Sequence, residues 1–263
     1  MLNQDILDSK LEWDKIRHNH RYLVLDNFVG FNLAVDIRKE ILDSRMLEPN
    51  KWDRYDNPFE QKNTFRDKFT LPPNTAKLLE YLNGDEFLDK LGCLTGYKIL
   101  EDKTRNWWGI HTFNNGDYLD IHLDAGLHPQ TKLKKYLTLG IYFSTDWTYK
   151  NGGSLELWSG DSAIKPDAKL FECIAKIEPI FNRMILFECN DYAWHGAPEA
   201  CICQNGEQRI FITCSYLIES INFIDPLANT RMKALFIAKP DEEFNNAKQQ
   251  LRIMRSNGSL KFT

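Results

Sequence analysis

The residues with the clearest chemical potential lie in the stretch 118–124, which reads Tyr-Leu-Asp-Ile-His-Leu-Asp. Apolar and polar residues alternate here with a period of two, as is typical of a half-buried strand. The alternation predicts an apolar face, Leu119, Ile121 and Leu123, and a polar face, Tyr118, Asp120, His122 and Asp124. An imidazole and a carboxylate two positions apart on one strand face could supply two ligands of a metal site.

A second histidine could complete such a site. Trp194-His195-Gly196 is the best candidate, because it follows a strand-like run over residues 185–188. Two histidines and one carboxylate that leave coordination positions open describe the site of non-haem Fe(II) oxygenases. His122, Asp124 and His195 also fit the two-histidine, one-carboxylate set of a zinc hydrolase, so these three residues alone leave both metals open.

Arg209, which opens a predicted strand after His195, favours iron. In this oxygenase chemistry 2-oxoglutarate chelates the iron through its keto-acid end, and a cation must hold its far carboxylate. A guanidinium does so through two parallel charge-assisted hydrogen bonds that lysine cannot copy. Zinc hydrolysis does not need this arginine. The rival of a different class is a non-catalytic jelly-roll binding module, which has no reason to aim a cation at a metal.

The elements that must position these residues are short strands separated by turns, the pattern of a β-sandwich or barrel. The predicted strands of this core are 107–113, 118–124, 137–143, 155–158, 174–177, 184–187 and 209–217. Asn114-Asn115-Gly116 and Asn151-Gly152-Gly153 are strong turn signals between them.

Helical patterns flank this core. Residues 1–20 read as a polar helical lead-in, 22–28 as a short strand, 75–94 as two short helices and 228–256 as a helical tail. Asn32 is predicted to cap a helix whose stripe is Leu33, Ile37 and Ile41. Residues 47–70 show no clear period, which predicts a lid-like functional loop or a surface wrap. We therefore expect one mainly β domain over 1–263, with a helical layer and lid-like loop (1–96), a core (97–218) and a helical tail (219–263).

Composition bounds the function. The chain has 263 residues, of which 43% are hydrophobic, so it can bury a sizeable core. A net charge of -4 argues against a nucleic-acid binder. No apolar run reaches the roughly 18 residues of a membrane span, and the N-terminus lacks a signal-peptide pattern, so a cytoplasmic protein is expected. The six cysteines show no paired CxxC spacing, which disfavours both a structural zinc site and a disulfide framework.

Residues 107–217 resemble the Fe(II)/2-oxoglutarate-dependent dioxygenases of the prolyl 4-hydroxylase-like group. The resemblance rests on ordered segments: GDYLDIHLD (116–124), LGIYFSTDW (139–147), GGSLELW (152–158), PIFNRMILFE (179–188), WHG (194–196) and Arg209. NPFEQK (57–62) and LPPN (71–74) resemble a bacterial branch of that group. The resemblance implies a double-stranded β-helix (jelly-roll) core with iron at one mouth.

The resemblance also implies roles for single residues. His122, Asp124 and His195 would bind Fe(II), and Arg209 would bind 2-oxoglutarate. Tyr142, Tyr118 and Thr213 complete the expected co-substrate site. The implied reaction hydroxylates an unactivated C–H bond with O₂ and releases succinate and CO₂, with ascorbate as a candidate reductant. Because Asp124 keeps its carboxylate, a related halogenase activity is not expected.

The substrate does not follow from the resemblance. Phe211 stands where the family commonly has serine, and Phe113 stands where collagen-type prolyl hydroxylases have tyrosine. The substrate is therefore a peptidyl residue such as proline, or a small molecule such as an amino acid or sugar derivative. An open groove along residues 47–70 would favour a peptide, and a closed pocket beneath them a small molecule. Neither nucleic acid nor membrane is expected as a partner.

Several neighbours of the ligand strand have two interpretations. His111 and His128 could reach the substrate or be structural, and Trp107 and Trp108 could wall the pocket or pack the helical layer. The lysines at positions 132, 134 and 135 are predicted to form a solvated loop, although they could steer an acidic substrate. Arg183 is predicted to form a structural ion pair.

Overall fold

A computed structural model of the chain describes residues 1–204, 207–219 and 231–259. Its strands form one continuous sheet in which every neighbouring pair is antiparallel. The strands are β1 (Tyr22–Leu25), β2 (Trp52–Asn57), β3 (Glu60–Phe65), β4 (Gly109–Phe113), β5 (Leu119–Leu123), β6 (Lys134–Tyr142), β7 (Leu155–Gly160), β8 (Leu170–Ile177), β9 (Met184–Glu188), β10 (Trp194–Ala197), β11 (Arg209–Ile218) and β12 (Leu235–Phe236).

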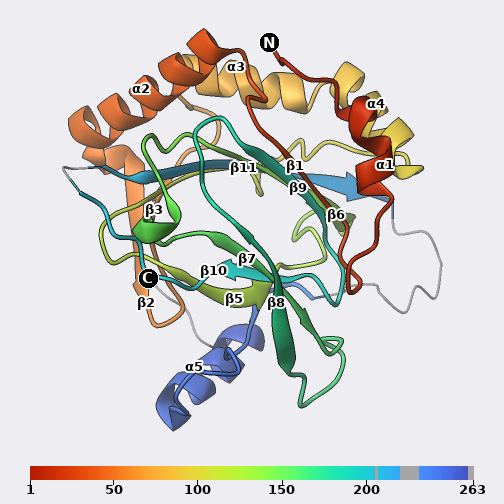
Figure 1. Cartoon of the computed structure of the whole chain (residues 1–263), viewed down its shortest axis with the longest axis vertical. Coiled ribbons are helices and arrows are strands. Elements are labelled where there is room, and N and C mark those ends of the chain that lie inside the picture. The colour runs from red at the N-terminus through yellow and green to blue at the C-terminus, as the bar shows by residue number, and fades with distance from the viewer. Residues whose placement is uncertain (205–206, 220–230, 260–263) are drawn as a thin grey trace.

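The sheet folds over on itself into two layers, as Figure 1 shows. Its strand order is β1-β9-β6-β11-β4-β3-β5-β10-β7-β8, with β12 on β5 and β2 on β3. The first half of this order lies beneath the helices, and β5, β10, β7 and β8 form the opposite layer (Figure 1). The predicted mainly β jelly-roll core with flanking helices is confirmed.

The helices are α1 (Lys10–Trp13), α2 (Phe31–Leu47), α3 (Pro73–Leu82), α4 (Asp85–Thr95) and α5 (Asn246–Ser256), with short 3-10 turns at Ile6–Ser9, Pro49–Lys51 and Tyr149–Asn151. The predicted helices in 75–94 correspond to α3 and α4. The N-cap of α2 is Gly30, so the prediction that Asn32 caps this helix is wrong. The helix begins at Phe31, one residue before Asn32, and the amide of Gly30 donates to the carbonyl of Met1.

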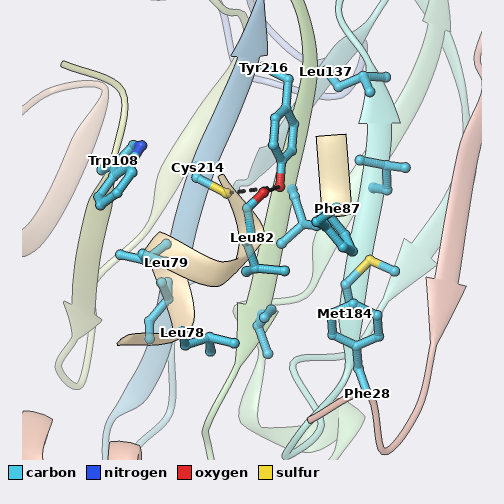
Figure 2. Packing of buried hydrophobic residues seen from close by; sticks show 14 of the residues in the cluster. Phe28, Leu78, Leu79, Leu82, Phe87, Trp108, Leu137, Met184, Cys214 and Tyr216 are labelled. Carbon is cyan, nitrogen blue, oxygen red and sulfur yellow. Dashed lines mark hydrogen bonds between the residues drawn. The ribbon is translucent and has the colours of Figure 1, made fainter. Parts of the chain in front are cut away.

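The main core lies where α3 and α4 pack on the sheet layer that contains β9, β6 and β11, and Figure 2 shows its packing. Leu78, Leu79 and Leu82 from α3 pack with Phe87 from α4 against side chains of β9 and β11. The hydroxyl of Tyr216 donates to the carbonyl of Leu82 at 3.0 Å, which satisfies a buried polar group. This bond ties the helical layer to β11, the strand that begins with Arg209.

The predicted lid-like loop over residues 47–70 is wrong. Its residues form the β2–β3 hairpin, which joins the sheet through Asn63 opposite Thr112 and Thr64 opposite His111 in β4. The sequence of β3 shows no alternation of apolar and polar residues. This is because the strand presents the polar residues Glu60, Lys62 and Thr64 to a cavity rather than apolar residues to a core. Residues 1–96 are thus not purely helical, since β1, β2 and β3 all belong to the common sheet.

Two further expectations need correction. Strand β5 is buried on both faces rather than half-buried, because Asp120 of its polar face is covered by Arg252 of α5 and His122 faces the cavity between the sheet layers' side chains. The predicted helical tail over 228–256 is helical only from Asn246 to Ser256, and residues 235–236 form β12. Residues 228–230 of that prediction lie outside the described part of the chain. Within the described ranges, no helix has the length and apolar character needed to cross a membrane.

Candidate metal centre

The sheet places the two predicted histidine ligands side by side. His195 of β10 lies directly opposite His122 of β5 in the antiparallel register, and their ring centroids are 4.5 Å apart. Asp124 follows the last residue of β5. One potential ligand atom from each of His122, Asp124 and His195 lies within 4.8 Å of the others. Residues that are far apart in sequence thus converge with the donor set that Fe(II) prefers.

Hydrogen bonds orient both imidazoles. Nδ1 of His122 lies 2.9 Å from the carbonyl oxygen of Asp120, and Nδ1 of His195 lies 2.8 Å from that of Ala193. Each Nδ1 must therefore carry the proton, which leaves the Nε2 lone pair free to bind a metal. Burial also lowers the pKa of His195 to about 3, so this ring is neutral, as a ligand must be.

Asp124 is held by a lysine. The Nζ of Lys135 lies 2.6 Å from Oδ2 of Asp124, and the Thr138 hydroxyl lies 3.4 Å from the same oxygen. Burial raises the pKa of the Asp124 carboxyl, but Lys135 and the histidines outweigh this and hold it well below its usual range. The carboxylate is therefore ionised. The prediction that Lys135 belongs to a solvated loop is wrong, because it is the second residue of β6 and is only 5% exposed.

Arg209 lies at the other end of the same site. It is 3% exposed, and its Nε donates to the carbonyl of Gly153 at 2.7 Å. Its guanidinium carbon lies 4.5 Å from the ring centre of Phe113, 5.1 Å from that of Tyr142 and 5.3 Å from that of Phe211. The two phenylalanines that depart from the family pattern thus enclose this cation.

The Arg209 end fits an anionic co-substrate. Among the described residues, no carboxylate lies within ion-pair distance of the guanidinium, and a buried cation without a counter-ion is costly. The hydroxyl of Tyr142 is also buried without a hydrogen-bond partner. Gly153 has a φ of +61°, and a Cβ there would lie 3.0 Å from Cδ of Arg209, so glycine permits this close approach. Both orphaned groups match the far carboxylate of 2-oxoglutarate.

One cavity of about 440 Å³ joins the two ends, a size usual for small-molecule sites. His122, Asp124, His195 and Arg209 line it, together with Thr213 and His111. The β2–β3 hairpin and Arg255 of α5 form further walls, and Trp107 and Trp108 also border it. The hairpin and Arg255 could not be found from spacing, because their approach depends on tertiary packing.

Some predicted residues lie elsewhere. Tyr118 does not line this cavity: its hydroxyl donates to the carbonyl of Pro58 at 3.3 Å, beside a separate hollow near Asp120. His128 is fully buried, with Nε2 2.9 Å from the Thr104 hydroxyl, and is structural. Arg183 pairs with Asp26 at 2.6 Å, as predicted for a structural ion pair.

Comparison with known proteins identifies the chemistry of this arrangement. Residues 108–216 match the sequence model of the 2OG-Fe(II) oxygenase superfamily. They form a 2OG-Fe(II) oxygenase domain. The match spans β5, β10 and the start of β11, so it includes the metal triad and Arg209. No curated protein sequence matches the chain.

Solved structures share the fold of this oxygenase. A prolyl-4-hydroxylase from Pseudomonas putida is 11% identical with a TM-score of 0.54, over 80% of this chain and 98% of that one. A prolyl hydroxylase from Trichoplax adhaerens, in complex with a hypoxia inducible factor peptide fragment, is 16% identical with a TM-score of 0.56, over 81% and 87%. HygX from Streptomyces hygroscopicus, with nickel, 2-oxoglutarate and hygromycin B bound, is 13% identical with a TM-score of 0.51, over 83% and 88%.

These findings confirm the predicted class. The protein is a 2-oxoglutarate-dependent dioxygenase that uses Fe(II) and 2-oxoglutarate. The zinc hydrolase and the non-catalytic binding module are not favoured, because neither accounts for an unpaired arginine in the cavity of the metal ligands.

Proposed function

We propose that His122, Asp124 and His195 bind the Fe(II), and that Arg209, Tyr142 and Thr213 hold 2-oxoglutarate in the oxygenase. The single observation that supports this best is that the ligand triad and an unpaired buried guanidinium line one cavity. When bound, the iron and its co-substrate supply the oxidising chemistry for an unactivated C–H bond. The chain contributes orientation and a water-poor site.

Each end of the cavity has a defined task in this proposal. Arg209 holds the far carboxylate of 2-oxoglutarate with charge-assisted bonds, and the Tyr142 hydroxyl donates a further one. The aromatic rings around the guanidinium keep water away, which strengthens these bonds. At the metal end, Lys135 holds the Asp124 carboxylate in place, as partners of metal ligands commonly do.

We further propose that the substrate is a small molecule rather than a peptide. The β2–β3 hairpin and α5 wall the cavity, and its volume of about 440 Å³ must hold both 2-oxoglutarate and substrate. A concave site of this size suits a compact molecule. The single domain is proposed to act in the cytoplasm, since all six cysteines are free thiols. Recovery of the protein from an extracellular or periplasmic fraction would refute that location.

The test is succinate formation from 2-oxoglutarate under air with added Fe(II) and ascorbate. Wild type is compared with Asp124→Ala, Arg209→Ala and the matched surface variant Lys77→Ala, whose side chain is exposed on α3. We expect Asp124→Ala to abolish turnover, Arg209→Ala to need far more 2-oxoglutarate, and Lys77→Ala to behave as wild type. Failure of 2-oxoglutarate to bind the anaerobic Fe(II) protein would refute the assignment.

A further inference from the structure

The cavity wall away from Arg209 and the metal triad is rich in charge. The β2–β3 hairpin, the residues just after it and α5 contribute four cations, Lys62, Arg66, Lys68 and Arg255, and two carboxylates, Asp53 and Glu60. Since 2-oxoglutarate is assigned to Arg209, the surplus of positive charge on this wall is available to a different ligand.

Two of the four cations are already neutralised. Nζ of Lys62 lies 2.9 Å from the carboxylate of Glu60, and Nε of Arg66 lies 2.7 Å from that of Asp53. Each of the two carboxylates on this wall, Glu60 and Asp53, is therefore already paired with one cation. Only Lys68 and Arg255 are left over.

Lys68 and Arg255 have no acidic partner within ion-pair distance in the described ranges. The ammonium of Lys68 donates to the backbone carbonyl of Phe65 rather than to a carboxylate. Nε of Arg255 is buried and makes no hydrogen bond. A half-buried cation held without a counter-ion costs stability, and the cost is offset when an anion binds beside it.

The two cations flank the approach to the metal. Along β3, Glu60 lies opposite Leu119 of the ligand strand, and Thr64 lies opposite His111 of β4. Lys68 and His111 line the same cavity, and so do Arg255 and His122. Both cations therefore line the cavity that His122, Asp124 and His195 also line.

We propose that the substrate is a small molecule with a carboxylate or phosphate group, and that Lys68 and Arg255 bind this group. The inference rests on the proposed function, because it assumes that 2-oxoglutarate occupies the Arg209 end. When Lys68 and Arg255 hold its anionic group, the rest of the substrate extends toward His122, Asp124 and His195. The carbon to be oxidised then lies near these proposed metal ligands. Trp107 and Trp108 offer apolar surface to the remainder of the molecule.

The test uses the whole protein loaded with Mn(II) and 2-oxoglutarate without oxygen, so that the Arg209 end is filled and no turnover occurs. Inorganic phosphate and acetate are titrated separately by calorimetry, and the anion that binds tells which acid group the site accepts. We expect one of them to bind wild type, and to bind Lys68→Gln and Arg255→Gln about tenfold to a hundredfold more weakly. The exposed-surface control Lys77→Gln should bind as wild type. Thermal unfolding verifies that each variant is folded, and Lys68→Met replaces Lys68→Gln if it is not.

Two results would overturn the inference. Neither anion binds wild type, or binding is unchanged in the Lys68→Gln, Arg255→Gln double variant. The affinity for 2-oxoglutarate, measured on the same samples, separates this failure from that of the proposed function: retained affinity leaves the oxygenase assignment intact, and lost affinity refutes it. Tighter binding of a short Glu-rich peptide than of either anion would overturn the choice of a small molecule.

Discussion

The ammonium of Lys135 and the carboxylate of Asp124 form a partly buried ion pair with a separation of 2.6 Å at the candidate metal centre. The pair joins β6 to the end of β5, and the Lys135 ammonium also lies 5.2 Å from the ring centre of Trp107. A lysine that neutralises the carboxylate of a proposed metal ligand stabilises the protein before the metal binds. The contribution of Lys135 to stability should therefore differ between the metal-free and the metal-bound protein.

Replacing Lys135 by Met should destabilise the metal-free protein by about 3 kcal/mol or less, because it leaves a partly buried carboxylate without its partner. The loss should be smaller with Mn(II) bound, since the metal then compensates the charge of Asp124. Urea unfolding with and without Mn(II) measures both values. Lys132→Met, which alters an exposed lysine of the adjacent loop, is the control. Equal losses in the two states would contradict this role for Lys135.

Arg209→Lys should raise the KM for 2-oxoglutarate at least about tenfold, and it should change kcat less. Lysine keeps the charge but loses the planar fork and the stacking against Phe113, Tyr142 and Phe211. Succinate formation at varied 2-oxoglutarate concentrations measures both constants. An unchanged KM in Arg209→Lys would show that the guanidinium does not touch the co-substrate.

The convergence of His122, Asp124 and His195 could be predicted from sequence, because strand alternation and ordered motifs both point to it. That Lys135 would be the partner of Asp124 could not be predicted from the sequence. Whether Lys134 or Lys135 faces the carboxylate depends on the register of β6 against β11, which local sequence does not specify. The hairpin was missed for a related reason: Glu60, Lys62 and Thr64 face a polar cavity, so β3 lacks the apolar alternation that reveals ordinary strands.

Anion affinity at the substrate end should fall as the pH rises through 8. The pKa of Lys68 is lowered to about 8, mainly by burial, which outweighs the nearby carboxylate of Asp53; the charge of Lys62 adds to the shift and Asp67 opposes it. Lys68 is thus protonated and able to bind an anion below pH 8, and becomes neutral above it. Calorimetric titration of phosphate or acetate between pH 7 and pH 9.5 follows the loss. Lys68→Arg should remove this pH dependence, because arginine stays charged; the same decline in that variant would assign it to another group.

Lys68 should lower the stability of the protein at neutral pH, although its charge favours anion binding. The pKa of Lys68 is about 8 in the folded protein against an ordinary value of 10.5, so the unfolded chain binds more protons between these values. At pH 7 the charged lysine therefore costs stability, and Lys68→Met should raise the free energy of unfolding by about 1–2 kcal/mol, allowing for partial exposure. The gain should shrink as the pH rises from 8 to 10.5. A Lys68→Met protein that is less stable at pH 7 would contradict the uncompensated charge.

The C-terminal helix should control substrate binding without affecting the co-substrate. Arg252 is 3% exposed and joins α5 to β5, with NH2 3.0 Å from Asp120 and 2.7 Å from Glu242. In Figure 1, α5 lies on the β5 side of the molecule, away from the helices over the other layer. Arg252→Ala should loosen α5 and with it the position of Arg255.

We therefore expect faster amide exchange in α5 of Arg252→Ala and an anion affinity lowered about tenfold, comparable with loss of one charged hydrogen bond. The affinity for 2-oxoglutarate should stay at the wild-type value, because Arg209 is anchored by Gly153 and its aromatic neighbours rather than by α5. Gln250→Ala, an exposed position on the same helix, controls for the substitution itself. If the affinities for both ligands fell together, α5 would support the whole cavity rather than the anion site.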